Sequence, residues 1–145
     1  MMRLANVLKQ AALSLFLVAV VATSAYAGDK AVYHIDNSAE QALKGLRNIR
    51  NQLDVAPGTK IVVVAHADGI DFLMEGAKDP KGGVEYAPLV SALKAKGVAF
   101  EICEITMKRR NLAKDKFVMD ADFTPSGVVR ITQLQAQDHY AYIKP

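Results

Sequence analysis

The sequence has 145 residues, of which 51% are hydrophobic, and a formal net charge of +3. This length limits the chain to one domain besides any targeting segment, and the hydrophobic content is adequate for a packed core. Nucleic acid is excluded as a partner because binding a polyanion requires a concentrated basic field. Only residues 108–110 are densely basic, and such a triplet is typical of a solvated helix face.

The first 27 residues have the pattern of a secretory signal peptide. Two basic residues precede an uncharged apolar run at residues 11–22, and alanines at positions 25 and 27 match the signal peptidase requirement. The alternative is a retained membrane anchor, but the run is short for spanning a bilayer. We expect cleavage after Ala27, a periplasmic mature domain over residues 28–145, and no membrane attachment afterwards.

Removing this segment changes the charge balance. Arg3 and Lys9 are two of the 18 basic residues, which leaves 16 basic against 15 acidic residues and a net charge of +1. The high isoelectric point therefore belongs largely to the leader.

The mature chain opens with a β-α-β pattern. Residues 30–36 have the β-branched and aromatic content of a strand. Ser38 with Gln41 three residues later is a capping box, which predicts an amphipathic helix ending before residues 57–58, Pro-Gly. Residues 60–67 form an uninterrupted apolar run, typical of a parallel strand buried on both faces. Together they predict a right-handed βαβ unit.

A short apolar helix at residues 70–74 and a loop at residues 75–83 come next. Loops of this kind beyond a strand's end serve either as mobile lids or as ordinary surface excursions. A second amphipathic helix has Pro88 in its first turn and Gly97 as its left-handed stop.

The third strand is predicted over residues 98–104, where Glu101 interrupts the apolar pattern. A charge at this place indicates either a sheet edge or a contact between subunits. A short helix over residues 106–112 follows, with Asn111 as its left-handed terminator.

The last third of the chain alternates in the same way. Residues 116–119 are a candidate fourth strand, and Ser126 caps a helix that reaches about residue 138 with Val128 facing inward. Residues 140–144 alternate like a strand. The order of elements predicts an α/β fold, a three-layer α/β/α sandwich around a mainly parallel sheet of about five strands.

Polar side chains end three of the predicted strands. In a parallel sheet these ends share one edge, and ligands bind in the crevice outside it. The residues brought to this edge are His34, Asp36, His66, Cys103 and Glu104. We expect the site there, with Cys103 and His66 as catalytic residues and the other three as binding residues.

Cys103 is the only cysteine and cannot form an internal disulfide. Its place before a helix stabilises a thiolate, whereas the neighbouring Glu104 opposes one. A reactive thiol, an inert buried thiol and an intermolecular half-cystine therefore all stay open. His66 is the candidate acceptor of the thiol proton. For His139 we expect an ordinary hydrogen-bonded side chain.

A metal site on the same strand ends is an alternative. His34, His66 and Cys103 are a ligand set that suits zinc or copper. Their spacing matches no compact motif such as CxxC or HExxH, so we predict neither a bound metal nor another cofactor. The chain also lacks a GxGxxG fingerprint, a Walker sequence and a GxSxG elbow, which disfavours dinucleotide, nucleotide and serine-hydrolase chemistry.

Three blocks of the mature chain, residues 62–74, 86–112 and 124–145, resemble the DsrE/DsrF-like family, in particular its exported branch. The resemblance implies a compact α/β/α domain that forms homo- or hetero-oligomers, most often trimers or their multiples. It also implies a cysteine that carries sulfur as a persulfide, a role that falls on Cys103. Two features depart from the family: Asn111 replaces a glycine, and the leader indicates export although the characterised relays are cytoplasmic.

The expected function is therefore a periplasmic, sulfur-relay-like thiol protein, a homo-oligomer that exchanges sulfur with a partner protein or a low-molecular-weight thiol. The alternative is a non-catalytic oligomer that binds a small molecule or metal in the same crevice.

Overall fold

The computed structural model describes residues 28–145. The predicted signal peptide and its cleavage site lie outside the described residues. Within the described part, no helix combines the length and the apolar character needed to cross a membrane.

The core of the fold is a five-stranded sheet whose strands all pair in parallel, in the order β4-β3-β2-β1-β5. The strands are β1 (Lys30–Asn37), β2 (Lys60–Asp68), β3 (Ala99–Cys103), β4 (Asp122–Thr124) and β5 (Ala141–Ile143). The central strand β2 is fully buried over residues 61–65 because helices cover both faces of the sheet. The predicted fold class is confirmed.

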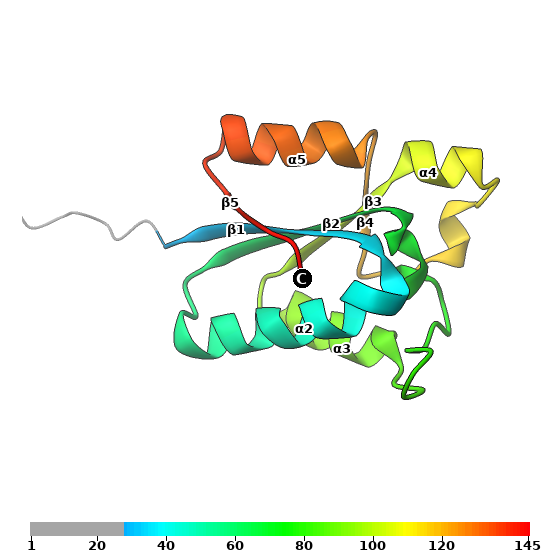
Figure 1. The fold of residues 1–145 in the computed structure, drawn as a ribbon, viewed down its shortest axis with the longest axis horizontal. Helices are drawn as coiled ribbons and strands as arrows, with labels where there is room; N and C mark the ends of the chain where they lie inside the picture. Colours follow the sequence, from blue (N-terminus) through cyan, green and yellow to red (C-terminus); the bar gives the residue numbers. More distant parts are fainter. Residues whose placement is uncertain (1–27) are drawn as a thin grey trace, which may run out of the picture.

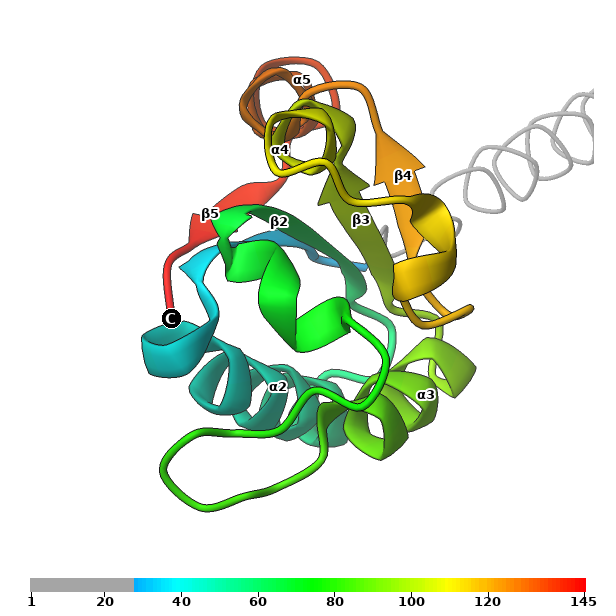
Figure 2. The same ribbon diagram turned by 90° about the vertical axis from the view of Figure 1, so that its right-hand side faces the viewer.

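Helices lie on the two faces of this sheet (Figure 1). The α-helices are α2 (Ser38–Val55), α3 (Tyr86–Ala95), α4 (Glu104–Arg109) and α5 (Gly127–Ala136), and the 3₁₀ turns are η1 (Gly69–Leu73) and η2 (Lys114–Lys116). Helices α2 and α3 cover one face, and α5 and α4 lie on the other (Figures 1 and 2). The larger core cluster contains the inward residues of α2 and α3. The smaller one joins α5 to β1 and β2.

Helix α2 begins differently from the prediction. Asn37 is the N-cap, and its side chain accepts a hydrogen bond from the N–H of Glu40. The Ser38 hydroxyl instead donates to the carbonyl of Gly69 and accepts from the N–H of Phe72, which ties the first residue of α2 to η1. The capping box was therefore placed one residue too late, because the serine serves a tertiary contact.

The segment between α4 and α5 contains most of the other differences. The fourth strand is Asp122–Thr124 and not residues 116–119, where only Phe117 makes an isolated antiparallel bridge. Helix α4 starts at Glu104, directly after β3, and ends at Arg109. Val128 is 61% exposed, so the prediction that it faces inward was wrong. The positive φ of Asn111 confirms the predicted left-handed terminator.

The charge on β3 has a partner within the chain. Glu101 accepts two hydrogen bonds from Arg130 of α5, at 2.7 and 2.9 Å. The Glu101 side chain is only 13% exposed in this arrangement. Glu101 therefore gives no reason to expect a subunit contact at β3.

The loop over residues 75–83 lies against α2, where Lys81 pairs with Glu40 at 3.1 Å. Figure 2 shows this loop on the α2 side of the sheet, opposite α5. It is held by its own contacts, since the Asp79 carboxylate accepts from the Gly82 N–H. A lid over Cys103, which faces α5, is therefore contradicted.

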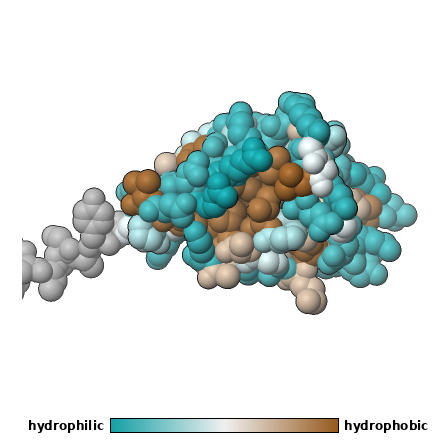
Figure 3. Space-filling model, turned by 90° about the horizontal axis from the view of Figure 1, so that it is seen from below, coloured by the Kyte–Doolittle hydropathy of each residue, from teal (hydrophilic) through white to brown (hydrophobic). Residues whose placement is uncertain are grey.

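An apolar groove runs between α2 and α3, lined among others by Leu46, Leu89 and Leu93. Figure 3 views the molecule from this side and shows the hydrophobic surface between polar margins. Because this face is opposite α5, the groove is separate from the strand-end residues predicted to form the site.

Candidate functional site

The site begins at a β-bulge between β1 and β2. The two strands pair in regular register up to Ile35 and Ala65, and the next pair is Asn37 with Asp68. Strand β2 thus contains one extra residue, and Ala67 takes a left-handed φ of 50°. The Ala67 N–H donates to the hydroxyl of Thr106 at 3.0 Å, which stabilises the strained residue. Bulges often redirect side chains next to functional sites.

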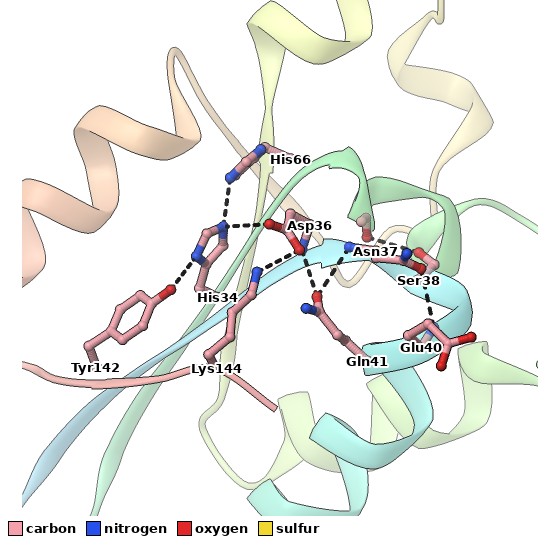
Figure 4. A network of polar contacts seen from close by, with 10 residues as sticks. His34, Asp36, Asn37, Ser38, Glu40, Gln41, His66, Tyr142 and Lys144 are labelled. Atoms are coloured by element: carbon pink, nitrogen blue, oxygen red, sulfur yellow. Dashed lines mark hydrogen bonds and ion pairs between the residues drawn. The ribbon is translucent and has the colours of Figure 1, made fainter.

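Two histidines meet at this point (Figure 4). The Nε2 atoms of His34 and His66 are 2.6 Å apart, and the rings stack with centroids separated by 4.7 Å. The Nδ1 atom of His34 lies 2.6 Å from the hydroxyl of Tyr142 on β5. One nitrogen of each histidine therefore points into the same small space.

Both histidines are held in the neutral form. Burial, followed by the charges of Lys144 and His66, lowers the pKa of His34 to about 4. Burial is also the main cause that lowers the pKa of His66. At neutral pH each ring then has one unprotonated nitrogen, the form in which histidine binds metals or accepts protons.

Asp36 completes the cluster. One carboxylate oxygen binds Lys144 Nζ at 2.5 Å, and the other lies 4.0 Å from His34 Nε2. The hydrogen bond from Lys144 is the main cause that lowers the Asp36 pKa. Gln41 of α2 accepts the Asp36 backbone N–H at 2.9 Å and fixes the strand end. The candidate ligand atoms of His34, Asp36 and His66 all lie within 4.8 Å of one another.

Cys103 occupies a separate pocket of hydrogen-bond donors at the end of β3. Burial raises the pKa of its thiol, but donors around the sulfur outweigh this effect and lower the pKa overall. These donors are the N–H groups of Gly127, Thr106 and Ile105 and the hydroxyl of Thr106. Cys103 is only 5% exposed.

Gly127, the first residue of α5, makes this arrangement feasible. A Cβ atom at this position would lie 3.2 Å from the Cβ of His66 and 3.3 Å from the Cβ of Cys103. The absence of a side chain lets the start of α5 approach both strands, so its N–H reaches the sulfur.

The five predicted residues do not form one group. His34, Asp36 and His66 come together, and Cys103 lies beside His66 where β2 and β3 end. His66 Nε2 faces His34, and the donors around the sulfur belong to α4 and α5. Glu104 instead pairs with Lys114 at 2.6 Å.

Sequence reasoning missed four contributors: Tyr142, Lys144, Thr106 and Gly127. The alternation of residues 140–144 does place Tyr142 and Lys144 on one face of a strand. The sequence pattern therefore indicated that Tyr142 and Lys144 share a face, but it did not indicate that β5 pairs with β1. For Thr106 and Gly127, which meet only through packing, we find no such signal.

Comparison with known proteins adds the family. The model of the DsrE/DsrF-like family matches residues 9–145. The chain is similar to a solved structure described as protein of unknown function MTH1491 from Methanobacterium thermoautotrophicum. The two share 30% identity with a TM-score of 0.71, over 81% of this chain and 99% of that one.

The ychN protein from E. coli has the same fold at 14% identity, with a TM-score of 0.65 over 80% of this chain and 99% of the other. The search among curated proteins gave no match. Because the family model covers nearly the whole sequence and the fold is shared with these structures, the chain belongs to the DsrE/DsrF-like family.

Proposed function

We propose that this protein is a sulfur-relay-like thiol protein in which Cys103 carries a sulfur atom as a persulfide. The observation that supports this most is the set of N–H and O–H donors around the Cys103 sulfur. A thiolate is the nucleophile in sulfur transfer, and donors of this kind stabilise the negative sulfur. Family membership is consistent with the same role.

The proposed step is a simple exchange of sulfur. The Cys103 thiolate attacks the outer sulfur of a low-molecular-weight persulfide, a new S–S bond forms at Cys103, and the sulfur–sulfur bond of the donor breaks. The donor leaves as a thiolate, so no external oxidant or reductant is consumed. The donors that stabilise the thiolate are also placed to stabilise the negative charge of the resulting persulfide.

Two features of the structure constrain the step. Because Cys103 is 5% exposed, the donor must be small, or side chains at the start of α5 must move to admit it. His66 is a neighbour of Cys103, but its Nε2 faces His34. Its proposed part as proton acceptor therefore depends on Nδ1, and replacing His66 with alanine should slow loading without preventing it.

Intact-mass analysis tests the proposal. Protein incubated with a small persulfide donor should gain the mass of one sulfur atom, and Cys103→Ser should gain none. Since the sequence has a single cysteine, that variant is a complete control for thiol chemistry. Wild-type protein that takes up no sulfur while its thiol still reacts with an alkylating reagent would rule out the relay.

The setting of this chemistry is proposed on the sequence alone. The leader pattern supports export to the periplasm, and the family resemblance supports a homo-oligomer that exchanges sulfur with a partner protein or a small thiol.

A further inference from the structure

The Nε2 atoms of His34 and His66 meet beside Asp36 and have no part in the proposed sulfur chemistry, in which only Nδ1 of His66 takes part. We propose that these three residues form a binding site for one divalent transition-metal ion of the zinc class, with coordination positions left open to solvent or ligand. This inference goes beyond the proposed function and does not depend on it.

The donor set is the first argument. Two imidazole nitrogens and one carboxylate oxygen form a three-ligand set of the kind that holds zinc in catalytic sites, with further positions open. The ligand atoms converge from the ends of β1 and β2 and lie within 4.8 Å of one another. The third ligand is Asp36, and not the Cys103 of the alternative that the sequence offers.

The distances are the second argument. Nitrogens bind zinc at about 2.0–2.1 Å, so two of them on a tetrahedral ion lie about 3.3 Å apart. The two Nε2 atoms are 2.6 Å apart, and His34 Nε2 is 4.0 Å from the nearer Asp36 oxygen. These separations lie on either side of the required value, and small rotations of three partly exposed side chains would adjust them.

The protonation pattern is the third argument. Two neutral imidazoles whose Nε2 atoms are 2.6 Å apart must share a proton between them. If each ring carries its proton on Nδ1, both Nε2 lone pairs become available to one cation, and His66 then cannot accept the thiol proton while the metal is bound. In His34 that Nδ1–H can donate to the Tyr142 oxygen 2.6 Å away. Such an outer partner orients a metal-binding histidine.

One contact opposes a cation. Lys144 binds the other oxygen of Asp36, and its positive charge faces the cluster. The Lys144 side chain is 35% exposed and can turn toward solvent when a metal binds. This contact predicts an unusual result: removing the lysine should tighten metal binding, whereas removing an ordinary structural residue would not.

The test uses Zn²⁺ alone, titrated calorimetrically into the full purified protein after treatment with a chelator. We expect one ion per chain, an affinity at least about tenfold weaker in His34→Ala and His66→Ala, and a smaller loss in Tyr142→Phe. Lys144→Ala should bind more tightly. His139→Ala is the matched control, since the third histidine is exposed and outside the cluster, and it should bind like wild type.

Two further measurements separate this proposal from the sulfur chemistry and from misfolding. Cys103→Ser should bind Zn²⁺ like wild type although it cannot load sulfur. Co²⁺ bound to the unaltered protein should show ligand-field absorption without a thiolate charge-transfer band, which requires no variant to fold. The proposal is overturned if wild type binds no Zn²⁺ at micromolar concentration, if His139→Ala weakens binding as much as His34→Ala, or if Co²⁺ shows thiolate ligation.

Discussion

The hydroxyl of Thr106 offers the sharpest test of how the fold activates Cys103. This hydroxyl accepts the N–H of Ala67 at 3.0 Å and donates to the Cys103 sulfur. In Thr106→Val the side chain keeps its shape, but it loses both the donor to the sulfur and the acceptor for the Ala67 N–H. A hydrogen bond to a charged group stabilises that group by about 1.5 kcal/mol. Losing it should raise the pKa of the Cys103 thiol, which lowers the ionisation constant of the thiol roughly tenfold.

The rate of thiol exchange at Cys103 should change less than the ionisation constant of the thiol. A thiolate with a higher pKa is more nucleophilic, with a Brønsted slope of about 0.4–0.5, so each remaining thiolate should react about threefold faster. At a pH below the thiol pKa of both proteins, exchange with a small disulfide reagent should therefore be about three- to fourfold slower in Thr106→Val. On the alkaline plateau, where the thiol is fully ionised in both proteins, the variant should be about threefold faster.

The measurement is the pH profile of this exchange for wild type, Thr106→Val and Thr106→Ser. Because donors lower the Cys103 pKa in the folded protein, the midpoint must move to higher pH in the valine variant. The serine variant keeps a hydroxyl and should follow wild type. Identical pH profiles of the exchange rate in Thr106→Val and wild type would show that the hydroxyl does not stabilise the thiolate.

Four further predictions concern stability, processing and assembly. Gly69→Ala should destabilise the fold by about 3 kcal/mol in denaturant unfolding, because the new Cβ would lie 2.0 Å from the carbonyl oxygen of Ile35. An unchanged denaturant concentration at the unfolding midpoint would disprove this close approach. Arg130→Met should cost about 2 kcal/mol by leaving Glu101 unpaired, and adding Glu101→Leu should recover much of it; equal stability of the single and double variants would contradict this. N-terminal sequencing of exported protein should begin directly after Ala27, and an intact N-terminus would end the export proposal. Light scattering at micromolar concentration should show a homo-oligomer, and a pure monomer would remove that proposal.

The architecture was predictable because its signals are local. The apolar run at residues 60–67 and the helical spacing after residue 38 depend on neighbours in sequence, and both elements are present in the structure. Strand β4 was misplaced because it is a three-residue edge strand beginning with Asp122, too short and too polar to show a period. Ser38 was misassigned because its hydroxyl is used between elements, which no local pattern reports.

The site was predictable only in part. The rule that parallel strands end at one edge correctly brought His34, Asp36 and His66 together. It could not separate Glu104, whose side chain turns to Lys114 as α4 begins. The residues that modify the site come from distant parts of the chain, and the spacing of residues does not indicate which distant elements pack together.

Thr106 connects the cluster of His34, Asp36 and His66 with the pocket around Cys103. A hydroxyl has one hydrogen, and because the Thr106 oxygen accepts the Ala67 N–H, its own hydrogen is free for the sulfur of Cys103. Ala67 adopts its left-handed conformation only at the bulge that follows His66. The same irregularity of β2 therefore contributes to placing one imidazole beside His34 and to orienting a donor toward the thiol. A change of register at this strand end would disturb both the histidine cluster and the thiol.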